Sequence, residues 1–338
     1  MSQRDTLQEW LDGQVVGLQA GQAVADAILA LADGARRITA LIRQGHLLER
    51  DPDEWSIQTV LEDGANTILR EVAESAPVAH YASEDHGDVI VLDSDGPLAL
   101  AVDPLDGASH LDANVVTGTI FSLYPKAADP VASFVRSGRD LLVAGYAMYG
   151  PRTVLVLTLG HGAAKFTLDP ATDRFLLTQP TMKTPEDADK FAINAANYRH
   201  WEPPVRAYID DCIEGRDGPR DKDFRMRWAS SLVAEAHRIL TLGGVFLYPR
   251  DSRPGRQKGT LRRVFDAVPI AMIAEQCGAA ATDGARPILD AVPEGLHDRA
   301  PLVFGSRMKV ERVQRYHQDP DFATDAAPLF GVRGLFRG

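Results

Sequence analysis

The sequence is poor in cysteine and has no long hydrophobic run. Its two cysteines, Cys212 and Cys277, lie far apart, which fits a reducing compartment better than a disulfide framework, and free cysteines of this kind are usually buried. A membrane helix needs roughly 20 apolar residues, whereas the run 154–159 has only the length of a strand. Residues 1–5 also lack the basic and apolar stretches of a secretory signal. We therefore expect a cytoplasmic protein that does not span a membrane.

Basic residues are in the minority. The chain has 36 Lys and Arg against 47 Asp and Glu, so its formal net charge is −11. This charge disfavours nonspecific binding to nucleic acid or to an anionic membrane. An acidic protein that binds an anionic substrate needs metal ions or a few focused Arg side chains, which reverse the sign of the field at its site.

Hydrophobic periodicity predicts helices first and a run of strands after them. Apolar residues recur at helical spacing over 21–44 and 57–72, which indicates two amphipathic helices. Short apolar segments bounded by Gly, Pro or Asp then predict strands at 89–92, 98–102, 118–124, 143–149, 153–159, 164–168 and 174–177. Tight turns join the last three strands, so we expect an antiparallel meander.

The pattern changes after a polar, Pro-bearing segment at 180–189. Beyond it we expect strands at 191–194, 244–248 and 302–305, and helices at 203–213, 229–240, 268–277 and 307–317. Alternation of this kind is typical of an α/β layer. Since 338 residues are many for one core, we place a domain boundary here. An N-terminal metal-binding domain would cover 1–185, and a C-terminal α/β substrate-binding domain would cover 186–338.

Acidic side chains gather where a predicted strand gives way to a loop. Pro104 restricts the backbone and Gly107 frees it, so Asp103 and Asp106 can turn the same way with the Leu105 carbonyl between them. Packed carboxylates repel one another unless a hard divalent cation such as Mg²⁺ lies between them. Such a site suits phosphoryl chemistry. Taken alone, Asp-Pro and Asp-Gly are also common turn dipeptides.

The wider context favours the metal site. The run 101–124 resembles the signature of the class I fructose-1,6-bisphosphatases, which belong with the inositol phosphatases to a lithium-sensitive, metal-dependent superfamily. Further segments resemble the same family, at 194–198, 226–234, 243–249, 261–262, 269–278 and 302–306. The resemblance implies an α/β sugar phosphatase fold with αβαβα layers, in which a mixed or antiparallel N-terminal sheet is followed by a second α/β sheet.

The resemblance also implies an activity. This is hydrolysis of the 1-phosphate of fructose 1,6-bisphosphate to fructose 6-phosphate and phosphate, with Mg²⁺ or Mn²⁺ as cofactor, in gluconeogenesis or the Calvin cycle. In the family the Arg at the position of Arg227 reaches into a neighbouring subunit's site, so at least a dimer is required and a homotetramer is expected.

Site residues follow from the matched segments. The implied metal ligands are Glu84, Asp85, Asp103, the Leu105 carbonyl, Asp106 and Asp266. The implied catalytic residues are Asp53, Glu84 and Asp106. The phosphate being removed would meet Gly107, Ala108 and Ser109 through backbone N–H groups and one hydroxyl. The rest of the substrate would be bound by Asn194, Tyr198, Arg227, Tyr248 and Arg262.

Several positions depart from the family pattern. Aspartates replace the usual glutamates at Asp85 and Asp266, and Ala108 and His110 replace a Ser and an Asn. Thr260 stands where a phosphate-binding Lys is usual, and Lys258, two residues earlier, is the candidate to replace it. The segment 53–59 should correspond to the family's catalytic loop, in which Thr59 takes the place of an Asp.

These departures leave two alternatives open. The first keeps the chemistry but changes the substrate to sedoheptulose 1,7-bisphosphate or another sugar phosphate, because Thr260 and His110 alter the pocket. The second is a catalytically weak paralogue that binds sugar phosphates or regulates an active homologue, because the segment 53–59 has lost family residues.

Overall fold

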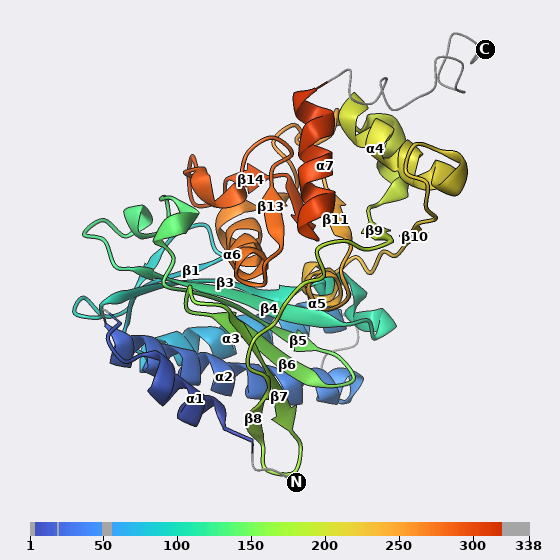
Figure 1. The fold of residues 1–338 in the computed structure, drawn as a ribbon. Helices are drawn as coiled ribbons and strands as arrows, with labels where there is room; N and C mark the ends of the chain where they lie inside the picture. Colours follow the sequence, from blue (N-terminus) through green and yellow to red (C-terminus); the bar gives the residue numbers. More distant parts are fainter. Residues whose placement is uncertain (1–3, 19, 49–55, 320–338) are drawn as a thin grey trace.

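The protein is built from five alternating layers of helices and sheets (Figure 1). A computed structural model describes residues 4–18, 20–48 and 56–319. An eight-stranded sheet carries helices on both faces, and a five-stranded sheet packs on the far side of the middle helices. The predicted αβαβα fold class is thereby confirmed.

The large sheet has the order β2-β1-β3-β4-β5-β6-β7-β8. β3 and β1 pair in parallel, and all other neighbours in the sheet are antiparallel. The predicted meander is therefore confirmed from β4 to β8. Its strands are β1 (Val78–Ser83), β2 (Ile90–Val91), β3 (Leu98–Asp106), β4 (Thr117–Pro125), β5 (Val143–Tyr149), β6 (Thr153–Thr158), β7 (Ala163–Asp169) and β8 (Arg174–Gln179). β1, which lies second from one edge of the sheet, is a strand that the sequence pattern does not predict.

Three helices cover one face of this sheet. They are α1 (Leu7–Gln14), α2 (Gly21–Gln44) and α3 (Ile57–Ser75), drawn in blue below the sheet in Figure 1. In α2 the buried residues Val24, Ile28, Leu31, Ala35 and Ile38 follow one another at three- and four-residue spacing, which places them on one stripe against the sheet. This layer fixes the strands that carry the acidic residues.

The second sheet has the order β10-β9-β11-β15-β13. Its strands are β9 (Lys190–Ala192), β10 (Arg225–Met226), β11 (Val245–Tyr248), β13 (Ala280–Thr282) and β15 (Leu302–Gly305). The helices α4 (Pro203–Glu214) and α7 (Arg307–Gln318) pack on its outer face. Two very short strands, β12 (Leu261–Arg262) and β14 (Arg299–Ala300), pair separately.

The middle layer consists of α5 (Leu232–Leu242) and α6 (Val268–Gln276). One hydrophobic core joins these helices to both sheets, and it includes Ile120 and Tyr146 of the large sheet together with Phe246 and Phe304 of the second. The domain boundary near residue 185 stays a prediction. Short helical turns complete the chain, at η1 (Gly45–Leu47), η2 (Ala108–Ala113), η3 (Val131–Ser133), η4 (Gly138–Asp140), η5 (Ala195–His200), η6 (Gly215–Asp217), η7 (Arg263–Ala267) and η8 (Ile288–Asp290).

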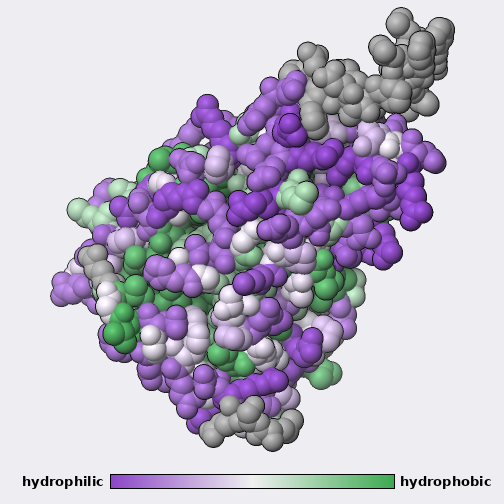
Figure 2. All heavy atoms as spheres, in the orientation of Figure 1, coloured by the Kyte–Doolittle hydropathy of each residue, from purple (hydrophilic) through white to green (hydrophobic). Residues whose placement is uncertain are grey.

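The surface agrees with the polar composition. Figure 2 shows mainly hydrophilic residues over α4 and α7, in the upper part of the view. In the part of the chain that the structure describes, every helix is too short or too polar to cross a membrane. Both cysteines are buried and unbridged, as the sequence predicts.

Candidate active site

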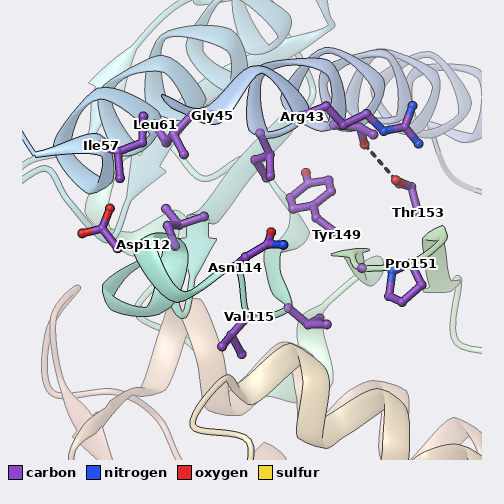
Figure 3. A pocket seen from close by; sticks show the side chains of 15 residues that line it. Arg43, Gly45, Ile57, Leu61, Asp112, Asn114, Val115, Tyr149, Pro151 and Thr153 are labelled. Carbon is purple, nitrogen blue, oxygen red and sulfur yellow. Dashed lines mark hydrogen bonds between the residues drawn. The ribbon is translucent and has the colours of Figure 1, made fainter. Parts of the chain in front are cut away.

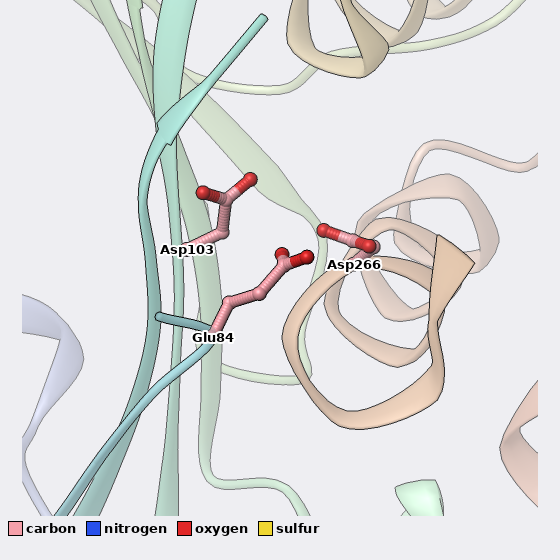
Figure 4. Close-up of side chains that lie close together, drawn as sticks. All are labelled: Glu84, Asp103 and Asp266. Atoms are coloured by element: carbon pink, nitrogen blue, oxygen red, sulfur yellow. The ribbon is translucent and has the colours of Figure 1, made fainter. Parts of the chain in front are cut away.

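Three carboxylates converge between the two halves of the chain (Figure 4). Glu84 follows β1, Asp103 lies in β3 and Asp266 lies in the turn η7. One carboxylate oxygen of each side chain lies within 4.8 Å of those of the other two. Asp103 and Asp266 are only 9% and 5% exposed. Residues separated by more than 160 positions in the sequence thus form one acidic cluster.

Backbone hydrogen bonds fix where these side chains point. The N–H of Glu84 donates to the carbonyl of Val102 at 3.0 Å, which holds the end of β1 beside β3. Asp103 accepts a hydrogen bond from the N–H of Leu105, two residues further along β3, at 3.2 Å. Asp266 accepts one from the N–H of Arg262 at 2.7 Å. The pairing of β3 with β4 is irregular between Asp103 and Asp106, so the strand bends at this point.

The cluster is costly to charge without a cation. Burial raises the pKa of Glu84 to about 7, and Asp85 and Asp106 add to this effect, while Arg262 opposes it. Burial, together with the charge of Glu84, also raises the pKa of Asp103 and of Asp266 well above the usual carboxyl range. Desolvation and mutual repulsion are the two forces that a divalent cation among these oxygens would offset. The oxygen-only donor set therefore fits a hard metal ion.

Two further predicted ligands lie beside the cluster and make other contacts. Asp85 accepts a hydrogen bond from Asn66 of α3, with 2.7 Å between Nδ2 and Oδ2. Asp106 accepts three hydrogen bonds at the start of α5, from the Ser231 hydroxyl at 2.7 Å and from the N–H groups of Leu232 and Val233 at 3.1 and 2.8 Å. Their metal-binding roles stay predictions. In this structure Asp106 joins the end of β3 to the N-terminus of α5.

The turn that follows Asp106 requires glycine. Gly107 has φ +78°, and a Cβ there would lie 2.9 Å from the Cβ of Ser231. The first hydrogen bond within η2 runs from the N–H of His110 to the carbonyl of Gly107 at 3.0 Å. Hydrogen bonding inside η2 thus does not use the N–H groups of Ala108 and Ser109. A short run of donors follows the acidic strand directly.

A cavity of about 460 Å³ contains the cluster. Most of the predicted metal- and phosphate-binding residues line it, namely Glu84, Asp85, Asp103, Leu105, Asp106, Gly107, Ala108, Ser109, Tyr248 and Asp266. Arg262 lies beside the cluster, with its Nε 3.6 Å from Oε1 of Glu84, and its NH1 donates to the carbonyl of His297 at 3.1 Å. Asp53, a predicted catalytic residue, lies outside the described residues.

The other predicted substrate residues make local contacts away from this cavity. The side chain of Asn194 caps η5 by accepting from the N–H of Ala196 at 3.2 Å. The hydroxyl of Tyr198 donates to Asp210 at 2.9 Å. Arg227 is exposed, and its NH1 donates to the carbonyl of Met226 at 2.8 Å. Within one chain, the structure does not bring these three side chains to the carboxylates.

Several cavity residues are absent from the sequence prediction. Gln58 and Glu62 line the cavity from α3, and Gln58 donates to Glu62 at 3.0 Å. Their four-residue spacing, continued by Asn66, places them on one helix face, which is a signal that the sequence does carry. Trp228 and Arg299 also line the cavity; Trp228 lies in the segment 226–234 that resembles the family, whereas no local pattern marks Arg299.

Two departures from the family pattern are now located. Thr260 lines the cavity, whereas the proposed replacement Lys258 is 62% exposed and pairs with Glu294. The interpretation of Lys258 as a substitute cation is therefore not supported by its contacts. Thr59 hydrogen-bonds Ser56 at the start of α3, with 3.1 Å between the hydroxyl oxygens.

A larger cavity of about 660 Å³ lies on the other side of η2 (Figure 3). It is lined by α2, the start of α3, the loop after η2 and the β5–β6 turn, and the hydroxyls of Thr39 and Thr153 meet there at 3.1 Å. Arg43 and Asp112 are its charged lining residues. It contains none of the clustered carboxylates, so we place the chemistry in the smaller, acidic cavity.

Known proteins resemble the chain over nearly its whole length. The family models described as the N-terminal and C-terminal domains of fructose-1-6-bisphosphatase match residues 58–180 and 184–318. The class 1 fructose-1,6-bisphosphatase of Nitrobacter vulgaris is 47% identical, with all of both chains covered. That of Cereibacter sphaeroides is 50% identical over 83% of this chain and 84% of its own. The solved fructose-1,6-bisphosphatase of Leishmania major in its apo form has a TM-score of 0.84 at 30% identity, covering 94% of this chain and 100% of that one.

Proposed function

The chain belongs to the fructose-1,6-bisphosphatase family, and we propose on that premise that it hydrolyses the 1-phosphate of fructose 1,6-bisphosphate to fructose 6-phosphate and phosphate. The observation that carries this proposal is the cluster of Glu84, Asp103 and Asp266. It lies in one cavity with the donor turn at Gly107, the segment 107–109 whose backbone N–H groups can donate hydrogen bonds. Oxygen ligands beside an anion-binding turn suit a metal-dependent phosphatase.

We propose Mg²⁺ as the metal, with Mn²⁺ as a substitute. Glu84, Asp103 and Asp266 would hold it, and the Leu105 carbonyl, Asp85 and Asp106, whose residues line the same cavity, would complete an oxygen shell. Hard divalent ions prefer such ligands. When bound, the ion would offset the charge of the phosphate and make a water molecule more acidic.

The protein's own groups would orient the reactants. The N–H groups of Gly107, Ala108 and Ser109, with the Ser109 hydroxyl, would hold the oxygens of the departing phosphate. Glu62 lines the same cavity from α3, and it would take a proton from the attacking water. In-line attack on phosphorus would release the C1 oxygen of the sugar as a hydroxyl.

Aromatic side chains would form the sugar's wall of the cavity. Trp228 and Phe246 stack with 5.8 Å between ring centroids, and Tyr248 lies 5.9 Å from Trp228. Flat aromatic faces suit the apolar C–H surface of a furanose, and the Tyr248 hydroxyl can bond a sugar or phosphate oxygen. This wall belongs to the C-terminal half of the chain, opposite the strand that carries Asp103.

We also propose that Arg227 acts on the site of a neighbouring subunit. Among the contacts described, its exposed guanidinium donates only to the carbonyl of the preceding residue, Met226. The guanidinium is therefore accessible to a second chain. Arg227, Asn194 and Tyr198 would then bind the phosphate that stays on the sugar. The assembly we propose is a homotetramer.

A second candidate substrate follows from Thr260. It lines the cavity where the family carries a cation, so a longer sugar bisphosphate such as sedoheptulose 1,7-bisphosphate is the alternative. A ratio of specificity constants that favours the longer sugar would select it.

Phosphate release tests the proposal. Purified protein is assayed with Mg²⁺ or Mn²⁺ against fructose 1,6-bisphosphate, sedoheptulose 1,7-bisphosphate and several monophosphates, beside an Asp103→Asn control. We expect release from the fructose bisphosphate that disappears with chelator and in the variant. Substrate binding without release by folded, metal-loaded protein would select a regulatory paralogue instead.

A further inference from the structure

Arg299 is the one cationic side chain in the lining of the carboxylate cavity, among the residues that the structure describes. The same lining contains six acidic residues, which are Glu62, Glu84, Asp85, Asp103, Asp106 and Asp266. A lone guanidinium in such a cavity dominates the local field on its side. The presence of Arg299 among these acidic residues therefore indicates a specific role for its charge.

The backbone and one hydrogen bond hold Arg299 at the cavity wall. It lies in β14, where it is the register partner of Arg262 in β12. Its NH1 donates to the carbonyl of Thr260 at 2.5 Å. This contact uses one of the five N–H donors of the guanidinium. A fork that is already oriented loses less conformational entropy when it binds an anion.

Three neighbouring cations each lie against a carboxylate, whereas no ion pair within 4 Å is found for Arg299 among the described residues. Arg262 lies against Glu84, Lys258 pairs with Glu294, and Arg263 pairs with Asp298 at 3.0 Å. Burial and the nearby charges of Arg262 and Arg256 lower the pKa of Arg299, while Glu84 and Asp266 oppose this effect from a distance. A guanidinium remains charged at neutral pH regardless. When a metal ion binds Glu84 and Asp266, their negative charges no longer balance the positive charge of Arg299. An added anion can then pair with Arg299.

We propose that Arg299 binds a phosphate group of the sugar bisphosphate and helps to determine which substrate is accepted. The inference rests on the proposed function and deepens it. The donor turn at Gly107 comes from the N-terminal half of the chain, whereas Arg299 projects from the C-terminal half beside Thr260 and Leu261. Arg299 thus contributes a positive charge at the place where Thr260 contributes none.

The test compares Arg299→Gln, Arg299→Lys and the control Lys258→Gln. KM and kcat are measured with fructose 1,6-bisphosphate, and calorimetry with Mg²⁺ measures binding of fructose 6-phosphate and, separately, orthophosphate. We expect Arg299→Gln to raise KM and to weaken fructose 6-phosphate binding by about 10- to 100-fold, with a much smaller change in kcat. Arg299→Lys should restore part of the affinity because it keeps the charge and loses the fork. Lys258→Gln should match the wild type.

The two binding probes distinguish the phosphate involved. Weaker fructose 6-phosphate binding assigns Arg299 to the phosphate that stays on the sugar, and weaker orthophosphate binding assigns it to the one removed. If KM and both affinities are unchanged in folded Arg299→Gln, the inference is wrong even though hydrolysis stands. If the wild type releases no phosphate yet binds fructose 6-phosphate through Arg299, the proposed activity fails and the inference survives.

A measurement on the unaltered protein covers the case in which Arg299→Gln does not fold. Phenylglyoxal modifies accessible arginines, and peptide mass spectrometry locates them. Fructose 6-phosphate should slow the modification of Arg299 and leave that of exposed Arg315 unchanged. Equal modification of Arg299 with and without the sugar phosphate would contradict the proposal.

Discussion

At the scale of single residues, Asp103 is held in a place that is unfavourable for a charge in the absence of metal. It is nearly buried and faces Glu84 and Asp266. We expect Asp103→Asn to lower turnover by at least about 100-fold, because a metal ligand is lost. In chelator, the same variant should melt at a higher temperature than the wild type, because folding no longer has to bury or protonate the Asp103 carboxylate.

Thermal unfolding with EDTA and with Mg²⁺ checks both effects. Mg²⁺ should raise the melting temperature of the wild type and leave that of Asp103→Asn almost unchanged. Asp88→Asn changes an exposed carboxylate a few positions from Glu84, and it should behave like the wild type in both buffers. If Asp103→Asn is less stable than the wild type when both are metal-free, other groups of the protein already compensate the Asp103 carboxylate, and the expectation is wrong.

The cluster also predicts how stability depends on pH. The pKa of Glu84 is about 7 in the folded protein, against an ordinary value of 4.5, so the folded state binds the proton more tightly than the unfolded state does. The stabilisation from this proton is complete below about pH 4.5 and is lost as the pH rises through 7. Its size is roughly 3 kcal/mol at most.

Denaturant unfolding of the metal-free protein between pH 5.5 and 8.5 measures this dependence. The free energy of unfolding should fall as the pH rises, and Glu84→Gln should flatten the curve. Saturating Mg²⁺ should reverse the trend, because the metal binds the deprotonated carboxylates. A metal-free stability that rises steadily over this range would contradict the assignment.

The sequence identified the acidic residues but not their partners. Glu84 and Asp103 lie in or beside a run whose family signature is specific, and Asp266 entered through the same resemblance. Arg299 carries no local signal, because its position depends on the pairing of two-residue strands at 261–262 and 299–300. Long-range pairing of this kind leaves no periodic trace in the sequence.

At the scale of elements, Ser231 connects Asp106, at the end of β3, to α5. Its hydroxyl donates to Asp106 at 2.7 Å and accepts from the N–H of Ala234 at 3.2 Å, so it serves as helix cap and carboxylate partner at once. We expect Ser231→Ala to lower the free energy of unfolding by about 1–2 kcal/mol. It should also lower kcat, since Asp106 loses one of the contacts that orient it.

Thr6→Ala is the matched control for this variant. Thr6 caps α1 in a reciprocal arrangement with Glu9, far from the cavity lining. Denaturant unfolding should show a loss of similar size for both variants, while only Ser231→Ala changes phosphate release. Equal kinetics in the two variants would show that α5 holds its position without this contact.

Periodicity predicted most of the regular elements and missed α1 and β1. The helix predicted at 21–44 and the strands of the meander agree with α2 and with β4 to β8, because burial on a defined face imposes a regular pattern. α1 has only 8 residues, although its Thr6–Glu9 capping box is a readable signal. β1 is buried throughout, but it follows Pro77 directly and contains His80, so its apolar run is broken.

At the scale of the whole molecule, the site we propose needs two chains. Mixed oligomers that contain one Arg227→Gln subunit and one Asp103→Asn subunit test this. The carboxylates of the first subunit and the arginine of the second would form an intact site together, so co-purified hetero-oligomers should regain activity that neither parent shows. Two affinity tags isolate the mixed species. Activity no greater than the average of the parents would place Arg227 in its own subunit's site.

The fold class could be predicted from the sequence, whereas the core shared by the two halves of the chain could not. The order of strands and helices, read with the family resemblance, leads to the αβαβα layers. The common core of α5, α6 and both sheets does not show in a linear pattern, because its members lie on either side of residue 185. Composition along the chain marks a change of element type there and carries no information on which faces pack together.

The helices of the middle layer come late in the sequence, and this affects folding during synthesis. Residues 78–179 contribute every strand of the large sheet, but the helices that cover its second face belong to residues 232–276. At about 5–20 residues per second, a ribosome needs on the order of 10 seconds to add them. During that interval the growing chain would expose an apolar sheet face before the helices that cover it are made, and we expect this stage of synthesis to be the one most prone to aggregation.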